Sequence, residues 1–129
     1  MRDPTPDELE LYAAARAAAA GAYAPYSGFA VGAAMRTASG EVITGVNIEN
    51  ASYGLTCCAE RTAMFTAVAA GERDFTAIAV HGDASSVPPC GACRQVLAEF
   101  APELVVVYRQ DGAPVSAALA ELLPARFEL

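Results

Sequence analysis

Three cysteines and one glutamate have the residue types and spacing of a metal site with an acid–base group beside it. Cys90 and Cys93 follow two prolines and are separated by two residues, so they share one face of the first turn of a predicted helix. Cys58 lies at the start of another predicted helix. Three thiolates can occupy three corners of a tetrahedral zinc site and leave the fourth for water. Glu60 can then exchange protons with that water without being a ligand.

The charge of such a site needs compensation. Three thiolates around Zn²⁺ leave a net negative charge, which opposes ionisation of the water. Two helix N-termini aimed at the sulfurs supply partial positive charge, and Arg61, which does not bind the metal itself, can donate a hydrogen bond to a ligand sulfur. A solvated helix residue is the alternative for Arg61, and a helix-dipole acid is the alternative for Glu60. The spacing from Cys58 favours the catalytic role for Glu60.

Other interpretations of the cysteines are buried apolar thiols, or a closed structural zinc site with Cys57 as fourth ligand. Adjacent helical residues point about 100° apart, so Cys57 and Cys58 do not aim at one metal together. This favours the open three-cysteine site, with Cys57 as a packed thiol. His81, the only histidine, falls at the end of a predicted strand and is expected to be structural.

The elements that must position these residues alternate between helix and strand. Thr5, Pro6 and Glu8 form a capping-box start for a helix that is expected to end near residue 20. A second helix is expected to begin near residue 57 or 58 and to end at Gly71. The remaining predicted elements are strands at 29–37 and 41–47 joined as a hairpin, a strand TAIAVHG, a helix at 91–100, a strand LVVVY and a helix at 115–123. Their order predicts an α/β sandwich with some parallel strands.

The second predicted helix carries no charge between residues 62 and 71. It is apolar nearly all round, so it is expected to be buried on all sides. In a chain this short, such burial indicates contact with a partner subunit.

Length and charge narrow the class of protein. A chain of 129 residues and 13.3 kDa is expected to form a single domain over 1–129. The net charge of −7 argues against a partner rich in phosphates, so nucleic acid is not expected. No segment resembles a membrane span or a secretion signal, and we expect a cytoplasmic protein with no membrane partner. In that reducing compartment the cysteines are more suited to metal binding than to disulfides.

The motifs together resemble a known family. Cys58-Ala59-Glu60 and the later PCGAC segment match the C-x-E and P-C-x-x-C pattern that characterises zinc deaminases. The segments PYSGFAVGAA, NIENASYGLTCCAERTA, PCGACRQVL and LLPARF occur in the expected order over almost the whole chain. The sequence therefore resembles the small, homo-oligomeric, zinc-dependent cytidine deaminases.

The resemblance implies a fold, a reaction and an assembly. The fold is a three-layer α/β/α sandwich with a mixed central sheet of about five strands. The reaction is hydrolytic deamination of cytidine and deoxycytidine to uridine and deoxyuridine plus ammonia, in pyrimidine salvage. The implied cofactor is one Zn²⁺ per subunit, bound by the three cysteines. The implied assembly is a homotetramer with its sites at subunit interfaces.

The resemblance also assigns substrate contacts. Asn47 and Glu49 match positions that bind the ribose hydroxyls, although a turn residue and a surface acid are the alternatives. Phe29 matches an aromatic beside the base, and Ala59 matches a residue whose backbone contacts the pyrimidine.

Two further positions imply contacts between subunits. Tyr53 is similar to a family position that reaches a neighbour's pocket. Phe127 resembles a C-terminal aromatic that covers a neighbour's site, although Arg126 replaces the commoner small residue before it.

Three rival functions remain. Deaminases of nucleoside-like antibiotics such as blasticidin S share the cysteine motifs, but Glu49 and the NIENASY segment favour a nucleoside. A zinc-stapled binding module without catalysis predicts a closed four-thiolate site. Nucleic-acid editing conflicts with the acidic charge. The Glu49 carboxylate and the absence of lysine also disfavour a nucleoside 5′-monophosphate as substrate.

Overall fold

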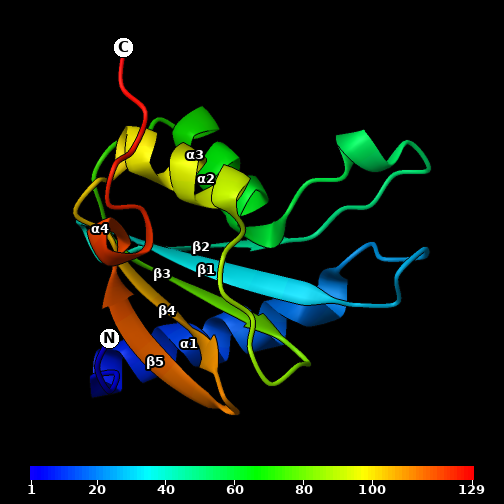
Figure 1. Ribbon diagram of the computed structural model, residues 1–129, viewed down its shortest axis with the longest axis horizontal. Helices are drawn as coiled ribbons and strands as arrows, with labels where there is room; N and C mark the ends of the chain where they lie inside the picture. Colours follow the sequence, from blue (N-terminus) through cyan, green and yellow to red (C-terminus); the bar gives the residue numbers. More distant parts are fainter.

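The computed structural model describes residues 1–129 as a five-stranded sheet with helices on both faces (Figure 1). The strand order is β2-β1-β3-β4-β5, with β3 and β4 parallel and every other neighbouring pair antiparallel. The elements in chain order are α1 Pro6–Ala18, η1 Ala19–Gly21, β1 Val31–Thr37, β2 Val42–Val46, η2 Tyr53–Leu55, α2 Ala59–Ala69, β3 Phe75–Gly82, α3 Gly91–Phe100, β4 Val105–Gln110, β5 Ala113–Ala118 and α4 Leu119–Leu122.

Two apolar clusters show that the sheet separates two helical layers. Side chains of successive strand residues point to opposite faces. Ala33, Met35, Ile78 and Val80 pack with residues of α2 and α3, whereas Ala34, Ala77 and Ala79 pack with α1. The expected three-layer α/β/α sandwich is confirmed.

Local sequence signals set the helix starts and one helix end. Thr5 accepts a hydrogen bond from Glu8 N, and the Glu8 side chain accepts one from Thr5 N, which completes the predicted capping box. Gly71 follows α2 with φ of 93°, a left-handed conformation that glycine adopts without strain.

A glycine on the sheet brings α2, which carries the functional residues, close to β2. A Cβ atom at Gly45 would lie 2.5 Å from the carbonyl oxygen of Ala59, closer than real contacts allow. Thr62 fixes the same contact, because its Oγ1 donates to Val46 O at 2.7 Å and accepts from Val46 N at 3.0 Å. The first turn of α2 is therefore held firmly on the sheet.

The predicted helix at 115–123 is wrong. Residues 113–118 form β5, which pairs antiparallel with β4 after a turn at Asp111 and Gly112, and only Leu119–Leu122 are helical. Pairing with a buried neighbouring strand outweighs the weak helical preference of this alanine-containing segment.

The single chain does not cover the outer side of α2. Ala59, Ala63, Met64 and Ala67 are buried, but Phe65 is half-exposed in the single chain. The sheet and α3 thus cover only one side of the helix.

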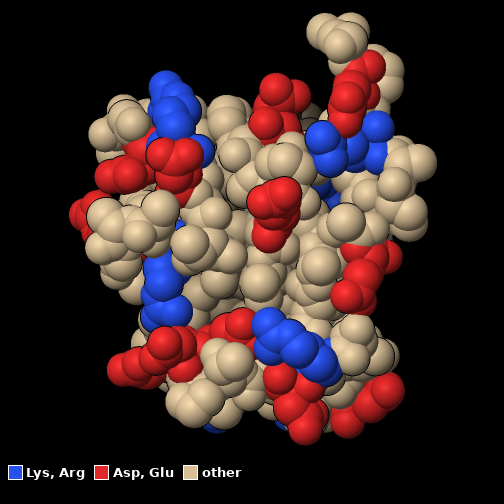
Figure 2. Space-filling view, turned by 90° about the vertical axis from the view of Figure 1, so that its left-hand side faces the viewer, with Lys and Arg blue, Asp and Glu red and all other residues tan.

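The surface has no continuous basic area on the face shown in Figure 2, where acidic groups and separate arginines are interspersed. No helix in the structure combines the length and the apolar character needed to cross a membrane.

Candidate active site

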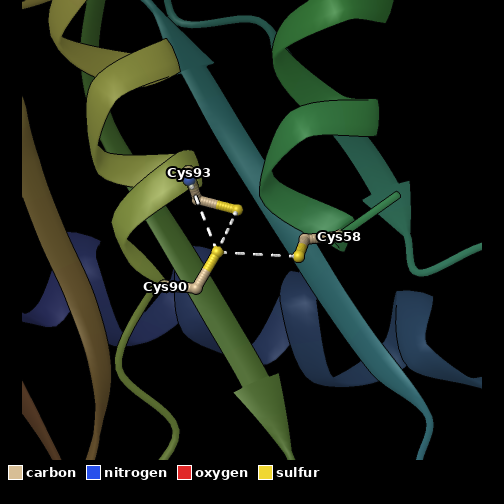
Figure 3. Close-up of side chains that lie close together, drawn as sticks. All are labelled: Cys58, Cys90 and Cys93. Atoms are coloured by element: carbon tan, nitrogen blue, oxygen red, sulfur yellow. Dashed lines mark hydrogen bonds between the residues drawn. The ribbon is translucent and has the colours of Figure 1, made fainter. Parts of the chain in front are cut away.

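Two helix N-termini meet at the predicted cysteine cluster (Figure 3). Cys58 is the N-cap of α2 and Cys90 is the N-cap of α3. Cys93 lies in the first turn of α3, and its backbone N–H donates to Cys90 Sγ at 3.5 Å. The positive ends of both helix dipoles therefore face the sulfurs, as the sequence predicts.

The three sulfurs are spaced as ligands of one ion. Cys90 Sγ lies 3.8 Å from Cys58 Sγ and 3.4 Å from Cys93 Sγ, and all three atoms lie within 4.8 Å of one another. Sulfurs bound at about 2.3 Å in a tetrahedral zinc site are about 3.8 Å apart. Cys57 and His81 are not part of this group.

The ionisation of the cysteines also fits a bound cation. The hydrogen bond from Cys93 lowers the pKa of the Cys58 thiol, and Arg61 adds to this effect. Burial of the thiol opposes it. That same bond, together with burial, raises the pKa of Cys93. A cation bound among the sulfurs would favour the thiolate form of its ligands. The donor set fits zinc.

Arg61 takes the expected place next to the cluster. Its guanidinium Nη2 donates to Cys58 Sγ at 3.3 Å and to Thr56 O at 3.5 Å. The hydrogen bond to Cys58 raises the pKa of the guanidinium, so Arg61 is a permanent positive charge beside the thiolates.

Glu60 lies in a cavity of about 190 Å³ beside two of the cysteines. Its side chain is only 5% exposed, and burial raises the pKa of the carboxyl above its ordinary value, with the charge of Cys58 adding to the effect. A carboxyl group with a raised pKa is suited to both accepting and returning a proton. The residues lining this cavity are Val31, Asn47, Thr56, Cys58, Ala59, Glu60, Val87, Pro88 and Cys90.

A second cavity of about 340 Å³ adjoins the first at Thr56 and contains Glu49 and Tyr53. The Glu49 carboxylate accepts hydrogen bonds from the backbone N–H groups of Tyr26 and Ser27, both at 3.0 Å, and from the Ser27 hydroxyl. The pKa of Glu49 is lowered mainly by the two hydrogen bonds from Ser27. Glu49 is therefore an oriented carboxylate rather than a free surface acid.

Asn47 is buried and bridges two backbone positions. Its Oδ1 accepts from Val31 N at 2.9 Å, and its Nδ2 donates to Phe29 O at 2.8 Å. One N–H of the amide remains for another partner. Asn47 thus fixes the segment before β1 while it lines the smaller cavity.

The aromatic candidates occupy three separate places. The Phe29 ring packs over Gly82 and is not among the residues that line either cavity. Tyr53 is 78% exposed at the larger cavity. Phe127 is 69% exposed, and its backbone exchanges hydrogen bonds with the side-chain amide of Gln95 at 3.1 and 3.2 Å. Neither cavity of the same chain includes Phe127.

Sequence reasoning missed two supporting residues. Ser27 orients Glu49, and Arg94 ties the loop before α3 to the C-terminal region by donating to Pro89 O and Leu122 O, both at 2.8 Å. A serine in a turn 22 residues from its partner carries no local signal of that contact. Arg94, next to Cys93, could have been noted as a residue beside the metal motif.

Comparison with known proteins decides the family. A sequence model described as "Cytidine and deoxycytidylate deaminase zinc-binding region" matches residues 6–109. The chain belongs to the cytidine deaminase family. A cytidine deaminase of Halalkalibacterium halodurans is 56% identical over 110 residues, which cover 83% of each chain.

Solved cytidine deaminase structures share the fold. The crystal structure of cytidine deaminase from Burkholderia pseudomallei matches with a TM-score of 0.88 and 52% identity, and it covers 92% of this chain and 98% of that one. A blasticidin-S deaminase of Bacillus cereus is 38% identical over 106 residues, covering 75% of this chain and 76% of that protein. The chain is therefore an enzyme, and the non-catalytic zinc-stapled module is set aside.

Proposed function

We propose that this enzyme deaminates cytidine and deoxycytidine to uridine and deoxyuridine plus ammonia, as a step of pyrimidine salvage in the cytoplasm. The observation that carries the proposal is the buried Glu60 carboxylate in the same cavity as Cys58 and Cys90. Relatives that are named cytidine deaminase and are up to 56% identical support cytosine as the base that is recognised and deamination as the reaction. Four free cysteines are consistent with a reducing compartment.

We assign one Zn²⁺ per subunit to Cys58, Cys90 and Cys93. When bound, the zinc supplies Lewis acidity that makes water a nucleophile near neutral pH. Arg61 offsets the negative charge of the thiolates through its bond to Cys58. The two helix N-termini act in the same direction.

Glu60 carries the protons. It accepts one proton from the attacking water and delivers it to N3 of the pyrimidine as the oxygen bonds to C4. It then accepts the remaining proton from the new C4 hydroxyl and delivers it to the amino nitrogen, which leaves as ammonia while C4=O forms. Burial keeps competing water away from the carboxyl group, and the raised pKa makes the return of the proton easier.

The two adjoining cavities divide the substrate between them. The base occupies the 190 Å³ cavity against the Ala59 backbone, and the sugar extends past Thr56 toward Glu49 in the 340 Å³ cavity. Glu49 and the free amide N–H of Asn47 bind ribose hydroxyls. The place of Phe29 beside the base is supported by the family resemblance rather than by a contact with either cavity. An antibiotic without a ribose would not use the oriented Glu49, so the structure favours the nucleoside over a blasticidin-like substrate.

The assembly is proposed to be a homotetramer with each site completed by neighbours. The half-exposed Phe65 on α2 and the exposed Tyr53 and Phe127 support an interface, because large apolar side chains gain by burial. Phe127 covers a neighbour's site in this arrangement. Light scattering should give four times the 13.3 kDa chain mass. The mass of a single chain would contradict the assembly.

Ammonia release from cytidine and deoxycytidine by the purified protein tests the function. Activity should disappear with a strong zinc chelator and return with added Zn²⁺. Cys58→Ala should lose zinc and activity, whereas the matched variant Cys57→Ala should keep both, because the Cys57 sulfur lies outside the cluster. Chelator-resistant activity, or zinc loss in Cys57→Ala, would reject the assigned site.

A further inference from the structure

The largest cavity lies on the face of the sheet opposite to the cysteines. It has a volume of about 590 Å³, and its lining shares no residue with the two substrate cavities. Ala77 and Ala79 pack toward α1, so strand alternation turns His81 to the same side. The polar side chains that line this cavity are Tyr12, Arg16, His81, Asp83 and Arg109.

Two arginines of this cavity differ from the others in the chain. The other six of the eight arginines donate a hydrogen bond or join an ion pair: Arg2, Arg36, Arg61, Arg73, Arg94 and Arg126. Arg16 and Arg109 have no such partner. Asp83 is the one acid of the lining, and it forms no ion pair. An overall charge of −7 thus coexists with a local excess of positive charge.

His81 adds a neutral donor to the cavity. The Tyr12 hydroxyl lies 2.6 Å from His81 Nδ1, and the two groups share a hydrogen bond. When Tyr12 is the donor, the imidazole proton is on Nε2. Burial and the charges of Arg16 and Arg109 lower the pKa of His81 against the opposing effect of Asp83, which favours the neutral ring.

We propose that this cavity binds a phosphate group, either free or as the monoester of a sugar phosphate. Planar guanidinium groups match phosphate oxygens in pairs and form the strongest hydrogen bonds available to side chains. The His81 N–H supplies a further donor, and a dianion relieves the repulsion between Arg16 and Arg109. A volume of about 590 Å³ accommodates the phosphate together with an attached sugar.

The single histidine makes the test selective. The imidazole Cε1–H signal in proton NMR reports on this cavity alone, because the chain has one histidine. Zinc-loaded protein is titrated with inorganic phosphate at constant ionic strength, with KCl as the control. We expect a saturable shift of the signal and a rise of about one unit in the His81 pKa, because a bound anion favours imidazolium. A shift that stays linear, or that KCl reproduces, would overturn the proposal.

Two substitutions and one matched control locate the binding. Arg16→Gln and Arg109→Gln should each weaken phosphate binding at least about tenfold, because each removes charge-assisted hydrogen bonds. Arg73→Gln should leave it unchanged, since Arg73 lies outside the cavity and donates only to the backbone carbonyls of Val68, in the last turn of α2, and Glu72, after it. Unaltered affinity in both cavity variants would reject the site.

The two sources of phosphate are separated by ribose 5-phosphate and ribose. A saturable shift with ribose 5-phosphate assigns the cavity to a phosphate monoester, and a shift with inorganic phosphate alone assigns it to the free ion. Ribose itself should give no shift. Cytidine turnover should be retained in both arginine variants, because neither residue lines the substrate cavities, so this test is independent of the deaminase assignment.

Discussion

Replacing Glu49 with glutamine tests how the enzyme reads the sugar. Two carboxylate oxygens offer about four acceptor positions, and three are occupied by Tyr26 N, Ser27 N and the Ser27 hydroxyl. One position therefore remains for a ribose hydroxyl. A hydrogen bond to a charged group is worth about 1.5–3 kcal/mol, which corresponds to a loss of about 10–150-fold in kcat/KM for cytidine.

The assay compares substrates with and without the sugar. Steady-state ammonia release is measured for Glu49→Gln with cytidine and with free cytosine. Cytosine has no ribose, so any turnover of cytosine should be unchanged by the substitution. Glu41→Gln is the matched control, because Glu41 is exposed in the turn between β1 and β2 and its side chain has no hydrogen-bond partner.

Two results would refute this reasoning. A loss of less than about twofold on cytidine would mean that the remaining acceptor position is not used. An equal loss on cytosine would mean that Glu49 acts by holding the protein together rather than by binding the sugar. Thermal unfolding of the variant checks that structural role, because a lowered melting temperature would accompany an equal loss on both substrates.

Three other predictions concern catalysis, packing and pH. Glu60→Gln should bind zinc normally but lose about 10²–10⁴-fold in kcat, and near-normal turnover would remove its proton-transfer role. Gly45→Ala should lower the free energy of unfolding by about 1–3 kcal/mol, because the added methyl group would collide with the backbone of α2. Gly54→Ala is the control and should change it very little, because no atom lies close to that position. Equal stability of the two variants would disprove the close approach of α2 to β2. Hydrogen bonding from Arg2 lowers the pKa of Glu8 from 4.5 to about 2, so this stabilisation is complete above 4.5 and is lost as the pH falls toward 2. The stability advantage of the native chain over Glu8→Gln, about 1 kcal/mol after solvent screening, should shrink as the pH falls from about 4.5 toward about 2, and an advantage independent of pH would contradict the assignment.

The parts of the site that rest on short-range signals were predictable from sequence. The helix starts at Cys58 and Cys90 follow from prolines, caps and periodicity, and the i, i+3 spacing of Cys90 and Cys93 fixes their shared face. These local rules bring three sulfurs to one point once the two helices pack on the same side of the sheet.

Features that depend on tertiary contacts were not predictable in the same way. The segment that forms β5 contains alanines and a proline, and only its ladder with β4 makes it a strand. The orientation of Glu49 depends on a turn 22 residues away, and the bond between Arg94 and Leu122 spans 28 residues. The exposure of Phe65 likewise follows from which side of α2 the sheet covers.

The central claim is that three cysteines hold the zinc and leave one ligand position open. X-ray absorption at the zinc edge, on zinc-loaded protein without substrate, measures this directly. We expect three sulfur scatterers at about 2.3 Å and one oxygen scatterer at about 2.0 Å, with an unchanged spectrum for Cys57→Ala. Four sulfur scatterers, one of them lost in Cys57→Ala, would contradict an open catalytic site.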